Sequence, residues 1–66
     1  MQVGELYRFG GYLCPQKFYD KIVVYLGEDP IHRSDGVTVI NHKIAIQGEP
    51  HTRIVDRTCL KWMIKV

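Results

Sequence analysis

The sequence predicts an all-β fold, a small barrel of five to six short strands that forms a single domain over residues 1–66. The main observation is the apolar run inside Lys21–Gly27, which is rich in β-branched and aromatic residues and is closed by glycine. Such a run is too short for a buried helix and is typical of a central strand. A second observation is that no stretch of the chain places apolar residues at the i, i+3, i+4, i+7 spacing of an amphipathic helix.

The central strand has apolar side chains on both faces, because the side-chain period of a strand is two. Ile22, Val24 and Leu26 share one face. Val23 and Tyr25 share the other. A strand of this kind needs cover on both sides, which a barrel provides. We expect Val24 to be buried in the barrel together with Ile22, Leu26 or both.

The first part of the chain predicts a strand followed by a long irregular loop. Val3–Phe9 alternates, with Tyr7 and Phe9 on one face, as in a half-buried strand. Gly10-Gly11 ends this strand, because paired glycines weaken strand continuation. Tyr12–Asp20 then forms an irregular connection to the central strand.

The second half of the chain predicts further strands and one helical turn. Turn residues at Glu28–Pro30 and Ser34–Gly36 bracket a second loop. The third strand is predicted from Val37 to Ile40, with two alternatives beyond it. Either Asn41-His42 is a turn, or the strand is long and bent and continues through Lys43–Gln47. The remaining segments are a strand at Thr52–Val55, a one-turn helix at Asp56–Thr58 and a last strand at Lys61–Val66.

Both ends of the chain resemble a known group of proteins. Met1-Gln2-Val3-Gly4-Glu5-Leu6-Tyr7-Arg8-Phe9 is similar to the opening of small barrel proteins encoded by tailed bacteriophages. Val55–Ile64 is similar to their ending, in which a one-turn helix presents a leucine before the final strand. The resemblance implies a barrel like that of Src-homology-3 (SH3) domains and a viral source. It implies no functional residue.

Charge and cysteine content place limits on the class of protein. Nine basic and seven acidic residues give a formal charge of +2, and the basic residues are spread singly along the chain. Nucleic-acid-binding domains usually have a clustered basic face instead. No signal peptide or membrane-spanning stretch is recognisable, so we expect a cytoplasmic protein, in a host cytoplasm or a virion if the source is viral. We expect Cys14 and Cys59 to be reduced.

Neither a metal site nor a catalytic site is predicted. Zinc sites hold ligands in close pairs such as C-x-x-C, and that spacing is absent among Cys14, Cys59, His32, His42 and His51. No nucleophile elbow, phosphate loop or paired-carboxylate motif is present. We expect no cofactor and no enzymatic activity.

The best candidate for a binding site is the first loop, Gly10–Asp20, with Tyr12, Lys17, Phe18 and Tyr19. Either its rings plug one end of the barrel, as loop aromatics do in small barrels, or they form an interaction surface. The preferred function is a non-enzymatic protein-interaction module, as a virion component or a small inhibitor or adaptor of a host protein. The alternative is a nucleic-acid-binding barrel, with rings that stack on bases between lysines. Self-association is left open.

Overall fold

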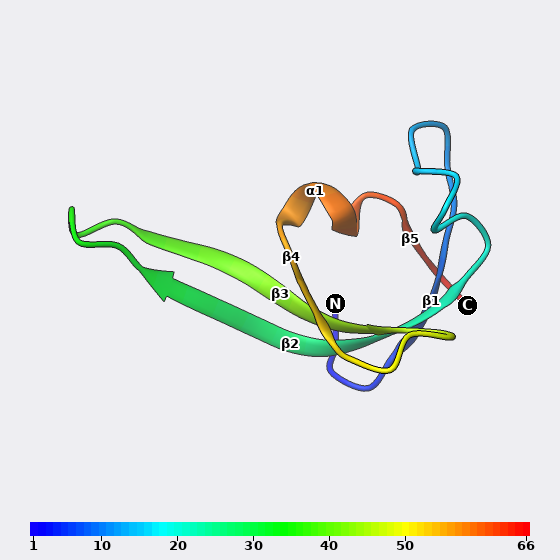
Figure 1. Ribbon diagram of the computed structural model, residues 1–66, viewed down its shortest axis with the longest axis horizontal. Helices are drawn as coiled ribbons and strands as arrows, with labels where there is room; N and C mark the ends of the chain where they lie inside the picture. The colour runs from blue at the N-terminus through cyan, green and yellow to red at the C-terminus, as the bar shows by residue number, and fades with distance from the viewer.

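The computed structural model describes all residues, 1–66, and shows a mostly β protein with one short helix (Figure 1). The elements in chain order are β1 (Leu6–Phe9), β2 (Ile22–His32), β3 (Thr38–Ile46), β4 (Arg53–Val55), α1 (Arg57–Leu60) and β5 (Met63–Lys65). All strands belong to one antiparallel sheet with the order β4-β3-β2-β1-β5. The all-β prediction and the helical turn before the last strand are confirmed.

The sheet is not closed into a barrel. β4 and β5 are its two edges, and no pairing joins them. Each of these strands is only three residues long, and α1 stands between them in the chain. Edge strands this short offer few backbone groups to each other, so the sheet stays open and has one covered face.

The core lies on that covered face. Phe9, Val23 and Ile44 are its largest fully buried side chains. The predicted inward orientation of Tyr7 and Phe9 in β1 is confirmed, since both are buried. The remaining buried members of the core are Tyr25, Ile46, Cys59 and Met63.

The prediction that Val24 is buried in the core is wrong. Val23 is fully buried, whereas Val24 is half-buried on the opposite face. The strand register explains this choice, because Val23 lies between Tyr7 of β1 and Ile46 of β3. Only one face of the open sheet is covered, so the side chains aligned with the other core residues are the ones that become buried.

β2 continues well beyond the predicted central strand, so the second loop is wrong at its Glu28–Pro30 end, whereas the predicted turn at Ser34–Gly36 is confirmed. The pairing of β2 with β3 passes Gly27 with a shift in register and continues to His32. This irregularity is a β-bulge, at which the backbone of Gly27 has φ +127°, a conformation that favours glycine. Asn41-His42 is likewise not a turn, and the alternative of a long third strand is the observed one.

The distal halves of β2 and β3 form a two-stranded arm that extends from the rest of the molecule (Figure 1). We define the arm as residues 27–43. The molecule measures 38 × 24 × 21 Å along its principal axes, and the arm lies along the longest one. Every residue from 31 to 40 is exposed. Neither β1 nor β4 pairs with residues 31 to 40, although β4 pairs with His42 and Lys43 at the base of the arm.

The helix α1 is fixed at its start by a side-chain cap. The carboxylate of Asp56 accepts hydrogen bonds from the backbone N–H groups of Thr58 (3.0 Å) and Cys59 (3.4 Å). Such a cap satisfies N–H groups that have no partner inside a helix. It directs the buried Cys59 towards the core, against which Leu60 and Trp62 also pack.

Candidate interaction surfaces

The first loop covers one end of the core with Phe18. The Phe18 ring is half-buried and stacks on the ring of Phe9, with 5.3 Å between centroids and 29° between planes. Two cations also lie near it: Lys17 Nζ is 5.0 Å and the Arg53 guanidinium 5.1 Å from the ring centroid. Phe18 therefore acts as a plug of the core, which is one of the two roles considered for the loop aromatics.

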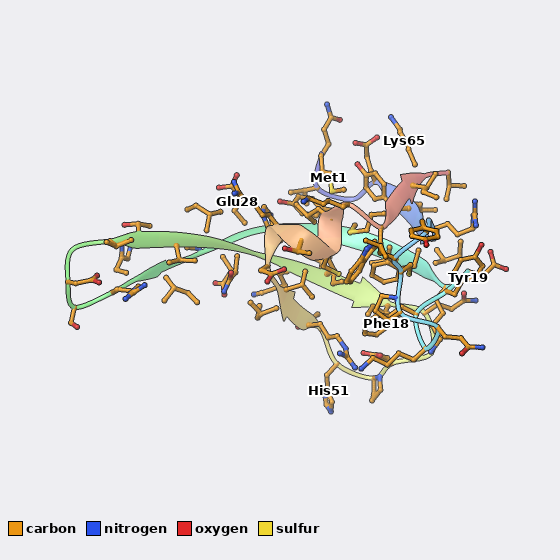
Figure 2. The ribbon with its side chains drawn as sticks, turned by 90° about the horizontal axis from the view of Figure 1, so that it is seen from above. Met1, Phe18, Tyr19, Glu28, His51 and Lys65 are labelled. Carbon is orange, nitrogen blue, oxygen red and sulfur yellow. The ribbon has the colours of Figure 1, made fainter.

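The two tyrosines of the loop are exposed to solvent, whereas Lys17 is exposed but holds its Nζ over the Phe18 ring. The exposed fraction is 99% for Tyr12 and 55% for Tyr19. Figure 2 shows Phe18 and Tyr19 at the end of the molecule opposite the tip of the arm. The four predicted site residues therefore separate into Phe18, which packs on the core, Lys17, whose Nζ lies over that ring, and two tyrosines that are free to contact a partner.

Phe18→Ala is expected to lower the free energy of unfolding by about 2 kcal/mol, below the full cost of deleting a buried phenylalanine because this ring is only half-buried. Tyr19→Ala is the matched control and is expected to change it by less than about 0.5 kcal/mol, as is usual for surface positions. Chemical denaturation of both variants checks the difference. Equal losses would show that the two rings have the same structural role.

A second surface is the uncovered face of the sheet, which we call the outer face and define by Leu6, Ile22, Val24, Ala45 and Ile64. The strand register places these side chains in two rows. In one row, Val24 lies between Leu6 and Ala45. In the other, Ile22 and Ile64 lie on either side of Arg8.

The outer face is apolar and slightly hollowed. A shallow depression of about 320 Å³ is lined by Ile22, Val24, Ala45, Ile46 and Gln47. The guanidinium of Arg8 forms an ion pair of 3.2 Å with Asp20, at the end of the first loop. The loop and the outer face therefore meet at this ion pair. The sequence signal for this surface is that the central strand has apolar side chains on both faces. By itself that pattern predicts burial of both faces, and the structure buries one of them.

The side chains with catalytic or metal-binding chemistry lie in separate places. No group of three or more histidine, cysteine or acidic side chains is arranged to hold a metal ion. Nδ1 of His42 is hydrogen-bonded to the hydroxyl of Tyr25 at 2.8 Å. Cys14 and Cys59 are both free. Burial raises the pKa of each thiol, and the nearby Asp56 carboxylate adds to the effect at Cys59.

The raised pKa of the Cys59 thiol predicts a loss of stability at alkaline pH. The unfolded chain has the ordinary thiol pKa near 9.0 and the folded chain a higher one. The folded state therefore holds the thiol proton more tightly than the unfolded state. The contribution of this thiol to the free energy of unfolding is fully present below pH 9 and is lost as the pH rises through the folded pKa. Denaturation between pH 7 and 11 is expected to show this decline. Cys59→Ala should reduce the slope, and an unchanged slope would assign the decline to other groups, such as the Tyr25 phenol, whose pKa burial also raises.

Comparison with known proteins finds no matching family model, and no curated protein or solved structure shows significant similarity to the chain. The only helix, α1, spans four residues, and none of the structure offers a long apolar helix suited to crossing a membrane. Fold and surfaces together define a small, mostly β protein with an open five-stranded sheet, an uncovered apolar face and a projecting arm.

Proposed function

We propose that this chain is a non-enzymatic protein-interaction module, built on an open relative of an SH3-like barrel, that binds a partner protein through the outer face of its sheet. The observation that carries the proposal is that the outer face presents adjoining apolar side chains that stay exposed or half-buried. Leu6 and Ile64 are exposed by 49% and 42%. Contiguous apolar surface of this kind on a folded protein marks sites of interaction.

The first loop supplies the rim of the same surface. Arg8 lies between two apolar residues of the outer face and is tied to Asp20 of the loop. Exposed Tyr12 and Tyr19 provide the amphipathic rings that are common at binding hot spots. Arg8 is the positive charge within the outer face, so the partner that fits is a protein with an apolar patch that includes an acidic group. Cytoplasmic location and a phage source, as a virion component or a host-protein inhibitor or adaptor, stay part of this proposal.

Nucleic-acid binding is less well supported by the geometry. In that function, the rings of Phe18 and Tyr19 would stack on bases between Lys17 and Lys21. The Phe18 ring instead stacks on Phe9 and is half-buried, so Tyr19 is the one ring of this pair that is exposed. Binding to nucleic acid would also weaken steeply with salt, because phosphate contacts release counterions. Binding through an apolar face would change little with salt.

The test is affinity capture from host extract followed by titration of the purified partner against Val24→Asp. This change places a charge at the centre of one row of the outer face and is expected to weaken binding by at least about 30-fold, corresponding to about 2 kcal/mol. Val3→Asp, at a position that is 68% exposed and lies outside the sheet, is the control. Circular dichroism checks that both variants are folded. Unchanged affinity in folded Val24→Asp, or capture of nucleic acid alone, would contradict the proposal.

A further inference from the structure

The two edges of the arm differ in how well they are protected against strand pairing. The β2 edge carries Glu28, Asp29 and Pro30. Charges and proline are the usual devices that prevent an exposed edge from pairing with another chain. The β3 edge has neither of them. Its sequence is Val37-Thr38-Val39-Ile40, which is uncharged and entirely β-branched.

The backbone of the β3 edge is also available for pairing. The N–H of Arg33 donates to the carbonyl of Val37 at 2.9 Å, which closes the turn of the arm. Because inward and outward backbone groups alternate along a strand, Val39 bonds towards β2, whereas Thr38 and Ile40 direct their N–H and C=O groups away from it. Further along the same edge, His42 and Ile44 are paired with β4. β4 ends at Val55, so Thr38 and Ile40 have no strand beside them.

A groove lies where the missing strand would continue. Its volume is about 460 Å³, and it is lined by Thr38, Val39, Ile40, Asn41, Asp56, Arg57 and Thr58. One wall is the free edge of β3 and the other is the start of α1. The groove therefore has the shape and the backbone hydrogen-bonding groups that an added extended strand requires.

We propose that the β3 edge pairs antiparallel with the same edge of a second copy of this chain, around a two-fold axis at Val39. In this register, Thr38 of each copy faces Ile40 of the other, and each of these pairs exchanges both of its backbone hydrogen bonds. If the register slides by two residues in either direction, one of the two hydrogen-bonded residue pairs is lost. Its partner position then falls either in the turn of the arm or on the part of β3 that is already paired with β4. The edge is self-complementary, as a two-fold interface requires.

Charge supports a second copy as the occupant. In the proposed register, Val37 of one copy lies opposite Asn41 of the other, so the turn of its arm comes up to the end of β4, whose Val55 pairs with His42, and to the start of α1. The turn carries Arg33 and Asp35, which form an ion pair of 3.0 Å. The facing segment carries Asp56 and Arg57. The Asp56 carboxylate caps α1, whereas Arg57 forms no ion pair within its own copy, so the charge contact that the interface offers is Arg57 with Asp35 of the other copy. Pairing also turns two marginal two-stranded ribbons into one four-stranded sheet.

Oxidative crosslinking tests the axis directly. Val39 lies on the two-fold axis in a non-hydrogen-bonded position, where facing Cα atoms are about 4.5 Å apart, within the usual range for a disulfide. Val39→Cys in a Cys14→Ser background is therefore expected to form a disulfide-linked dimer on mild oxidation. Ile31→Cys is the matched control, because Ile31 lies opposite Val39 on the other strand of the same arm and is similarly exposed. Two Ile31 positions would be about 14 Å apart, three strand spacings, so this variant is expected to stay monomeric.

Charge variants test the register in solution. The unmodified chain is expected to approach twice its monomer mass in sedimentation equilibrium as concentration rises. Thr38→Lys with Ile40→Lys places like charges opposite each other and is expected to give a monomer, whereas Thr38→Glu with Ile40→Lys pairs opposite charges and is expected to restore the dimer. Circular dichroism verifies folding. A chain that is monomeric up to about 1 mM, a dimer that persists in the double-lysine variant, or equal crosslinking of Ile31→Cys would overturn the proposal. Loss of this dimer leaves binding at the outer face intact, so the two proposals fail independently.

Discussion

Val23→Asp is expected to unfold the protein. Val23 is fully buried between Tyr7 and Ile46, with no polar group positioned to receive a carboxylate. Burying an unpaired charge costs several kcal/mol, and a domain of this size has only about 3–5 kcal/mol of stability. Circular dichroism and a denaturant titration are expected to show no cooperative unfolding transition for this variant at neutral pH.

Val24→Asp is the matched control for this effect. It introduces the same side chain one position along the strand, on the half-buried outer face. The carboxylate can reach water there, so we expect a folded protein with a loss of about 1 kcal/mol or less. An unfolded Val24→Asp beside a folded Val23→Asp would reverse our assignment of the two faces of β2.

Phe9→Ala is expected to cost about 3–5 kcal/mol, the usual range for deleting a buried phenylalanine. Phe9 is fully buried and its ring stacks on that of Phe18, so the substitution leaves a cavity and removes the support of the loop plug. A loss of this size is comparable with the whole stability of a small domain. The midpoint of chemical denaturation is expected to move close to zero denaturant.

Leu6→Ala provides the comparison within the same strand. Leu6 is 49% exposed on the outer face and should lose about 1 kcal/mol or less when truncated. Similar losses for the two variants would mean that β1 has no preferred inner face. That result would contradict the burial pattern of the strand.

The orientation of β1 could be predicted from the sequence, whereas that of β2 could not. In β1, charged Arg8 shows which face is not the core, and Phe9 is buried as expected. In β2, Val23 and Val24 are chemically identical, so a period of two gives no choice between the faces. The choice depends on pairing with Ile46, a partner distant in sequence.

The length of β2 was missed for a related reason. Glu28–Pro30 has the composition of a turn, and local composition was the only information available. The structure instead places Pro30 opposite Ile40 in the ladder, where its missing N–H belongs to the free edge of the arm. After the bulge at Gly27, β2 continues to His32, beyond the part of the sheet that covers the core.

The candidate site was predicted in part. The sequence leaves Tyr12, Phe18 and Tyr19 between a plug and an interaction surface, and in the structure the two tyrosines are exposed. For Phe18, the sequence does not decide between a plug of the core and part of an interaction surface. Its stacking on Phe9, which the sequence does not reveal, assigns it to the core. The outer face was missed because burial was expected wherever the central strand is apolar. An open sheet leaves one such face uncovered.

The bulge at Gly27 also divides the molecule into two units that differ in the cost of opening. Residues 31 to 40 are held by a single ladder and are exposed, whereas β1, the first half of β2 and the end of β3 share a buried core. Local opening costs least where few apolar contacts are lost. Amide hydrogens inside the arm's ladder, such as those of Ile31 and Val39, should therefore exchange with solvent by fraying of the ribbon. The amide hydrogens of Val23 and Ile44 should exchange only when the whole domain unfolds.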